Sequence, residues 1–92
     1  MSELNSFQIE CEQKLLEIIQ RSNCKLLNRK VEGINERFIT GDLSAKDLKV
    51  FIYSDGAEIS GTNIDERFES ADYDSLDDLR DSFIKKVSSL LI

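Results

Sequence analysis

The feature that most constrains this fold is a short β-prone run that ends beside an Asp-Gly pair. Residues 48–53 read Leu-Lys-Val-Phe-Ile-Tyr, which is rich in β-branched and aromatic side chains, and Asp55-Gly56 follows after one more residue. Such a pair between two β-prone stretches favours a two-residue type I′ turn, because both central positions of that turn need positive φ. We therefore predict a β-hairpin, which commits the middle of the chain to an antiparallel sheet.

This turn also predicts which side chains share a face of the hairpin. A turn centred on Asp55-Gly56 sets Tyr53 opposite Glu58 and Ile52 opposite Ile59. Side chains alternate between the two faces of a strand, so one face is apolar and the other mixes aromatic and polar residues. The apolar face carries Val50, Ile52 and Ile59, and the mixed face carries Phe51, Tyr53, Glu58 and Ser60.

The strands on either side of the hairpin have weaker signals. Beyond Ile59 the next apolar residues, Ile64 and Phe68, have the opposite parity, which predicts a β-bulge or break near residues 61–63. Apolar residues over 24–41 fit no single period, and we interpret this segment as two short strands.

A polar connection is expected between these two strands and the hairpin. It opens at Gly41-Asp42 and runs through Lys46, where polar residues replace the apolar ones on both sides. The second of the two short strands should therefore end by Gly41.

Helical periodicity marks both ends of the chain. Apolar residues recur at three- and four-residue spacing over about residues 6–21 and about residues 75–91, as in amphipathic helices. Asn5 and Gln8 have the spacing of a capping box at the start of the first helix.

The order of these elements predicts a single α+β domain over residues 1–92. It consists of a helix, a three- to four-stranded antiparallel sheet and a second helix, which Asp74 or Ser75 would cap. Placing both helices on one face of the sheet is the simplest way to bury both apolar stripes.

Residue types missing from the composition exclude most familiar active sites. Histidine is absent, which removes the commonest general base, the usual partner of a nucleophilic serine or cysteine, and the commonest zinc ligand. Cys11 and Cys24 form no C-x-x-C motif, and we interpret both as small apolar residues of a reduced interior. Acidic residues alternate with others at the start of residues 72–77, as in an EF-hand calcium loop. The segment lacks the glycine at the sixth position and the glutamate at the twelfth position of such a loop, so we expect no calcium site there. We expect no metal, no cofactor and no catalysis.

The N-terminal residues favour a cytoplasmic protein. Residues 1–5 have no basic region and no apolar run precedes Phe7, so we expect no signal peptide. No stretch is apolar over the length that crosses a bilayer, and no membrane partner is expected.

The negative charge comes from the C-terminal part of the chain. Residues 1–54 hold eight acids and eight bases, whereas residues 55–92 hold ten acids and four bases, which accounts for the net charge of -6. The acids gather where the hairpin passes into the last helix: Glu66, Glu69, Asp72, Asp74, Asp77, Asp78 and Asp81. Such a cluster repels nucleic acid and steers basic partners toward it. Helix capping and solubility are the alternative role of Asp74, Asp77 and Asp78.

The mixed face of the hairpin is a candidate interface. If the helices cover the apolar face, Phe51 and Tyr53 lie on the other face of the sheet beside Glu58. Aromatic side chains flanked by acids are typical of protein interfaces, since aromatics supply contact area and charges select a partner. The alternative is that the first helix, or a strand from residues 24–40, covers this second face and makes both aromatics core residues.

These features favour a binding protein without catalysis. The candidate partner-binding residues are Phe51, Tyr53, Glu58, Glu66, Glu69, Asp72, Asp74, Asp77, Asp78 and Asp81. In size and acidity the chain is similar to bacterial toxin-immunity proteins and phage-encoded inhibitors of host defence, a resemblance of kind that covers no motif. We expect a small inhibitor that blocks the basic surface of a nuclease or other nucleic-acid-handling protein and does not itself bind nucleic acid.

Two alternatives belong to other classes of protein. One is a structural or assembly protein that self-associates, for example as a homodimer, through a sheet edge or through Phe51 and Tyr53. The other is an enzyme that acts through Cys11, Cys24 or an Asp/Glu pair without histidine.

Overall fold

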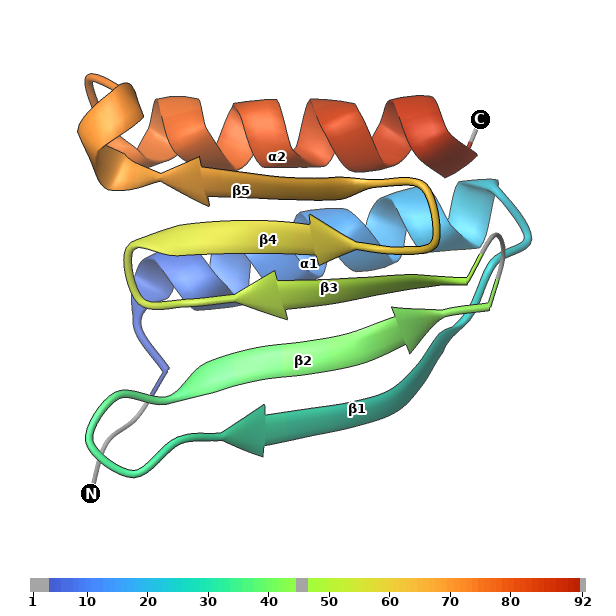
Figure 1. Cartoon of the computed structure of the whole chain (residues 1–92), viewed down its shortest axis with the longest axis horizontal. Coiled ribbons are helices and arrows are strands. Elements are labelled where there is room, and N and C mark those ends of the chain that lie inside the picture. The colour runs from blue at the N-terminus through green and yellow to red at the C-terminus, as the bar shows by residue number, and fades with distance from the viewer. Residues whose placement is uncertain (1–3, 45–46, 92) are drawn as a thin grey trace.

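The computed structural model of the chain describes residues 4–44 and 47–91 (Figure 1). Two of the expectations above fall partly outside the described residues. Residues 1–3 belong to the segment where no signal peptide is expected, and Lys46 belongs to the expected polar connection. The elements follow in the order α1 (Ser6–Arg21), β1 (Leu26–Glu32), β2 (Phe38–Leu43), β3 (Leu48–Ile52), β4 (Gly56–Ser60), β5 (Asp65–Glu69), the 3-10 helix η1 (Ser70–Asp72) and α2 (Leu76–Leu91). The predicted α+β order is confirmed, although the described residues form five strands rather than three to four.

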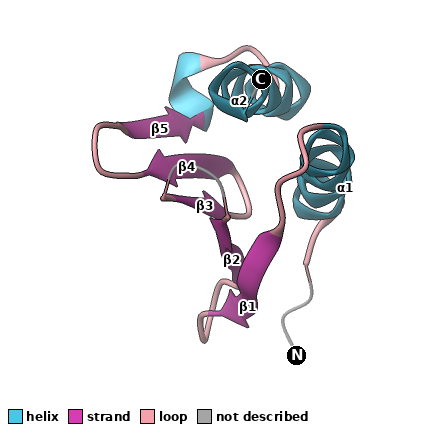
Figure 2. Cartoon of the chain, turned by 90° about the vertical axis from the view of Figure 1, so that its right-hand side faces the viewer, coloured by secondary structure: helices cyan, strands magenta, loops and turns pink. Residues whose placement is uncertain are grey.

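The strands form an antiparallel meander. Each described strand pairs with the next one in the sequence, so the order across the sheet is β1-β2-β3-β4-β5. Both helices lie on the same face of the sheet, as predicted, and α2 contacts β4 and β5 (Figure 2). Neither helix covers the opposite face, which we call the open face.

The core lies between the helices and the apolar face of the sheet. Phe83 and Leu79 of α2 are completely buried, as are Ile52 of β3 and Ile59 of β4, and all four belong to one cluster. Phe83 meets Phe68 of β5 edge to face, with 5.7 Å between the ring centroids. Such aromatic pairs add to the stabilisation from burial, and this one joins α2 to the edge of the sheet.

Local sequence determines where each helix begins. At α1 the Gln8 amide donates to Asn5 Oδ1 and the Asn5 amide donates to Gln8 Oε1, both at 2.9 Å, which confirms the predicted capping box. At α2 the Asp78 amide donates to Ser75 Oγ at 3.2 Å. Ser75, rather than Asp74, is therefore the residue that caps α2.

The β3–β4 hairpin forms, but the predicted turn type is wrong. The Tyr53 amide donates to the Gly56 carbonyl oxygen at 2.8 Å, which centres the turn on Ser54 and Asp55. Neither of these residues nor Gly56 has a positive φ, so the turn is not type I′. Gly56 is needed for another reason, because a Cβ there would lie 2.7 Å from the carbonyl oxygen of Phe68 on β5.

The register of the hairpin is shifted by two residues from the predicted one. Val50, and not Ile52, pairs with Ile59. Because the shift is an even number of residues, every side chain stays on its predicted face. Val50, Ile52 and Ile59 are buried under the helices, while Phe51 and Glu58 pair on the open face.

The predicted break after β4 is confirmed as a turn between two strands. β4 ends at Ser60 and β5 begins at Asp65, and the Gly61 amide donates to the Ile64 carbonyl oxygen at 2.7 Å. The reversal places Phe68 of β5 in the core, where it is 5% exposed.

The expected polar connection begins later than predicted. Two strands do form in the preceding segment, but β2 continues through Gly41 and Asp42 to Leu43. Gly41 is a packing residue rather than a turn residue, because a Cβ there would lie 2.7 Å from the Leu26 Cδ1 atom of β1. Asp42 is on the open face, where its carboxylate lies 3.7 Å from Lys49 Nζ of β3.

Candidate functional site

Three aromatic side chains gather on the open face of the sheet. The Phe51 and Tyr53 rings are stacked with centroids 6.2 Å apart, and the Tyr53 and Phe38 rings are tilted with centroids 5.2 Å apart. All three side chains are half-buried. We call Phe38, Phe51 and Tyr53 the aromatic cluster. Because both helices pack on the other face, neither Phe51 nor Tyr53 belongs to the core between helices and sheet.

Phe38 was not predicted as part of this cluster. It begins β2, one residue before the Ile39–Ile52 pair that fixes the register of β2 on β3. The pairing therefore sets Phe38 beside Tyr53, although 15 residues separate them in the sequence. Only the register of the strands, which the irregular apolar pattern of residues 24–41 does not reveal, could have identified it.

Glu58 and Glu69 lie beside the aromatic cluster and share one cation. Arg67 Nε lies 3.1 Å from Glu58 Oε1, and Arg67 Nη1 lies 3.8 Å from Glu69 Oε1. The Glu58 side chain is 14% exposed, whereas that of Arg67 is 66% exposed. Partial burial and the nearby Glu58 carboxylate raise the pKa of Tyr53 above its ordinary value, while Arg67 opposes the shift.

Most of the predicted acidic residues lie at one end of the molecule. The β3–β4 turn, the end of β5, η1 and the start of α2 meet there, on the left in Figure 1. We call this region the acidic end; its acids are Asp55, Glu69, Asp72, Asp74, Asp77, Asp78 and Asp81. The open end of the aromatic cluster, where Tyr53 follows β3, adjoins it.

The structure divides the predicted acids into two groups. Asp77 and Asp81 lie 3.1 and 3.3 Å from Arg80, which also lies 2.5 Å from Glu10 of α1. Arg80 and Glu10 join the two helices, and the two aspartates pair with Arg80 from its own helix. Among the described residues, no ion pair forms at Asp72, Asp74 or Asp78, and all three are exposed, so their charges are available to a partner.

Glu66 does not join the acidic end. It lies on β5, but its carboxylate is 3.5 Å from Lys86 Nζ of α2, which places it on the helix side of the sheet. The side chains of Arg67 and Glu69, on the same strand, point the opposite way and lie on the open face. The alternation along β5 therefore separates Glu66 from the other predicted partner-binding residues.

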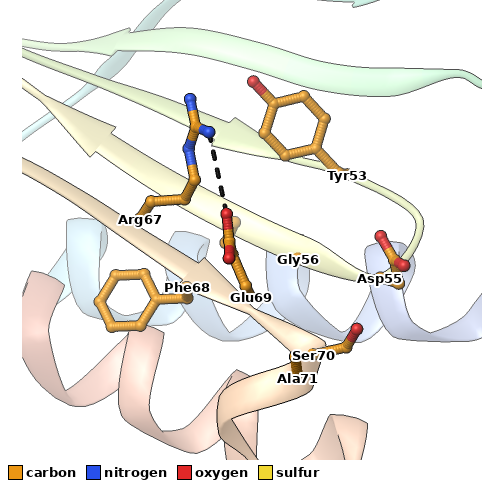
Figure 3. A pocket seen from close by; sticks show the side chains of 9 residues that line it. Tyr53, Asp55, Gly56, Arg67, Phe68, Glu69, Ser70 and Ala71 are labelled. Atoms are coloured by element: carbon orange, nitrogen blue, oxygen red, sulfur yellow. Dashed lines mark ion pairs between the residues drawn. The ribbon is translucent and has the colours of Figure 1, made fainter.

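A hollow of about 470 Å³ lies between the aromatic cluster and the acidic end. Tyr53, Asp55 and Glu69 surround it, and small residues, including Gly56 and Ala71, leave the space open (Figure 3). Its volume falls within the range of small-ligand sites. Sequence reasoning missed the hollow because it forms where the β3–β4 turn meets the end of β5, which are neighbours only in the folded chain.

Hydrogen bonds brace the loops at this end. Asn5 Nδ2 donates to the Ser54 carbonyl oxygen at 2.9 Å, and Gln8 Nε2 donates to the Arg37 carbonyl oxygen at 2.6 Å. Ser54 Oγ also donates to the Glu36 carboxylate. The β3–β4 turn is thus tied both to the start of α1 and to the β1–β2 loop, so the aromatic cluster is held in place before any partner arrives.

The two cysteines are buried, as the sequence predicts. Cys11 is completely buried and Cys24 is 6% exposed, and neither forms a disulfide. Burial raises the pKa of the Cys11 thiol to about 12; Arg80 opposes this, and Glu10 and Asp81 add to it. The thiol is therefore protonated at neutral pH.

Both thiols should accordingly react slowly in the native protein. We expect a disulfide reagent at pH 8 to modify Cys11 and Cys24 at least about tenfold more slowly in buffer than in denaturing urea, because the thiolate is the reactive form and access requires opening of the core. Absorbance of the released thiolate measures both rates. Equal modification rates in buffer and in urea would contradict this prediction and would favour the alternative that a cysteine acts as a nucleophile.

Among the described residues, no three cysteine or acidic side chains are placed to hold a metal ion. No helix in the described part of the chain is long and apolar enough to span a bilayer. Neither family models, nor curated proteins, nor solved structures give a match to the chain.

Proposed function

We propose that the protein is a non-catalytic binding module that inhibits a partner by covering its basic, nucleic-acid-handling surface. The observation that carries this proposal is the aromatic cluster on the open face of the sheet, directly beside the acidic end. The two features supply the two requirements of a specific interface, which are apolar contact area and a charge that selects the partner.

The aromatic cluster is suited to carry binding energy. Large aromatic side chains dominate the energetics of interfaces when they become fully desolvated at the centre. Phe38, Phe51 and Tyr53 already contact one another, so a partner would bury their remaining exposed area without first ordering them. Loss of side-chain entropy on binding is correspondingly small.

The acidic end sets the chemistry of the partner. Asp72, Asp74 and Asp78 project exposed charges without described ion pairs, and residues 55–92 contain the whole net charge of -6. Proteins that bind nucleic acid carry basic surfaces that contact phosphates, and an acidic surface attracts them while repelling nucleic acid. Association should therefore be fast at low salt and slower as salt rises.

Self-association through a sheet edge is less favoured by the strands themselves. β1 carries an irregularity between Leu27 and Lys30, with Asn28 at a φ of 53°, and bulges of this kind interrupt pairing with another chain. The opposite edge, β5, reads Asp-Glu-Arg-Phe-Glu, and charged side chains also protect an edge. Of the two surfaces considered for a homodimer, the open face is therefore the better candidate.

Capture experiments with three immobilised proteins test the proposed function. Wild-type protein should retain a basic partner from lysate of the source cell. Tyr53→Ala should reduce recovery of that partner at least about tenfold, because a central aromatic residue contributes a large part of the binding free energy. Leu27→Ala is the matched control: Leu27 is 44% exposed and pairs with Asp42, so it lies on the same face away from the cluster. Recovery with the control should change less than about twofold.

The purified partner then decides the functional class. Its nucleic-acid-processing activity should fall in proportion to bound wild-type protein and should persist with Tyr53→Ala. Recovery that Tyr53→Ala leaves unchanged, or full activity of the bound partner, would contradict the proposal. The self-assembly alternative would be supported if light scattering gave the molar mass of a dimer at both low and high salt, and that of a monomer for Phe51→Asp.

A further inference from the structure

The hollow at the edge of the aromatic cluster has the chemistry of a site for a cationic side chain. We propose that it seats an arginine side chain from the partner's basic surface, an inference that rests on the proposed function and adds the contact that selects the partner. The site is defined by Tyr53, Asp55 and Glu69 around the hollow and by Gly56 and Ala71 within it.

The walls of the hollow offer a ring and two carboxylates. The side chains of Tyr53, Asp55 and Glu69 surround the same space in Figure 3. Asp55 and Glu69 are exposed, so their carboxylates remain hydrated, and Tyr53 is half-buried and contributes to the lining of the hollow. A guanidinium can stack on an aromatic ring. At the same time its N–H groups, which lie in its own plane, can donate hydrogen bonds to carboxylates.

The chain's own Arg67 shows that this place accommodates a guanidinium. Its Nε lies 3.1 Å from Glu58 and its Nη1 lies 3.8 Å from Glu69, at the rim of the hollow (Figure 3). The 3.8 Å separation is too long for a strong hydrogen bond, and the Arg67 side chain is 66% exposed. Glu69 is therefore only loosely engaged, and a second guanidinium can take it over while Arg67 keeps Glu58.

Charge balance at the hollow favours a cation over any other ligand. Asp55 and Glu69 line the hollow with two negative charges, and the single positive charge there, on Arg67, is already paired with Glu58 outside the lining. Arginine suits the site better than lysine, because its planar group stacks on a ring and binds carboxylates through two donors, whereas an ammonium is a strongly hydrated point charge.

A titration with two short peptides tests the assignment. The probes are acetyl-Gly-Arg-Gly-amide and acetyl-Gly-Lys-Gly-amide, and the readout is the amide chemical shifts of Gly56, Ser70 and Ala71 in the full-length protein. We expect saturable shifts with the arginine peptide and an affinity at least about threefold weaker for the lysine peptide. Glu69→Gln should weaken arginine-peptide binding at least about fivefold.

Two matched variants separate a seated side chain from general attraction. Asp65→Asn removes the same charge from the same face at the other end of β5 and should leave the affinity within about twofold. Arg67→Gln should strengthen peptide binding by about twofold or more because it releases Glu69, whereas Lys49→Gln, which removes an equal charge beside Asp42, should not.

The outcomes distinguish this inference from the proposed function. Equal affinities for the two peptides, or equal effects of Glu69→Gln and Asp65→Asn, would overturn the seated arginine, since only the overall charge would then matter. No partner protein enters the titration, so such a failure leaves the capture result standing. Capture that depends on Tyr53 but is indifferent to Glu69→Gln would likewise overturn the arginine site alone.

Discussion

Replacing Phe83 with alanine should lower the free energy of unfolding by about 3–5 kcal/mol, the usual cost of truncating a buried aromatic side chain to alanine. Phe83 is completely buried, and its ring meets Phe68 of β5 edge to face. A domain of this size is stable by about 5–14 kcal/mol, so the change removes a large share of its stability. Urea unfolding followed by far-ultraviolet circular dichroism measures the loss.

Leu76→Ala is the control for this variant. Leu76 begins the same helix but is 37% exposed, and its truncation should cost about 1 kcal/mol or less. A loss below about 1 kcal/mol for Phe83→Ala would mean that the core collapses around the missing ring or that the ring is not the centre of the packing.

Changing Gln8 to glutamate should make stability fall as pH rises. Gln8 is 1% exposed; its Nε2 donates to the Arg37 carbonyl oxygen at 2.6 Å and lies 3.4 Å from that of Ile52. A protonated carboxyl can make the shorter bond in place of the amide, but a carboxylate would face two carbonyl oxygens in a dry site. We expect burial and these oxygens to raise the pKa of the introduced group in the folded state above about 4.3, its unfolded value, although the Asn5 amide that donates to this side chain opposes the rise.

The sign of the effect follows from proton binding. Above the unfolded pKa the unfolded chain has lost the proton that the folded protein retains, so stability declines with rising pH until the folded pKa is passed. We expect a loss of at least about 1 kcal/mol at pH 7, with little loss near pH 4. Urea midpoints of Gln8→Glu and wild type across this range measure the difference.

Gln13→Glu makes the same chemical change on the same helix at an exposed position. The urea midpoint of this variant should change with pH in the same way as that of the wild type, because a hydrated carboxyl binds its proton equally well in the folded and unfolded states. If Gln8→Glu also ran parallel to the wild type, the buried bonds from Gln8 to Arg37 and Ile52 would not exist in solution.

Features that depend on neighbours in the sequence were predicted well. The capping box of Asn5 and Gln8 and the apolar spacing after it placed the first helix at residues 6–21, where α1 lies. Phe51 and Glu58 were assigned to the correct face, because alternation along a strand does not depend on which turn joins it to the next.

Features that depend on contacts between distant residues could not be predicted. The role of Gly56 is set by the backbone of Phe68 on the neighbouring strand, and a rule based on the Asp-Gly pair alone assigned it to a turn. Asp77 and Asp81 look like solvated acids in the sequence, yet Arg80 joins them to Glu10 of α1, 70 residues away. The same limit explains why Phe38 and the hollow were missed.

The meander has a consequence for the rate at which this protein folds. Each described strand pairs with its neighbour in the sequence, so the sheet closes only short loops, and sheets with such local contacts form faster than those built from distant strands. Docking of α1 against α2 is the step that must bring the two ends of the chain together. We therefore expect the strands to pair before the two helices dock, which φ-values measured in β3, β4 and the helices would test.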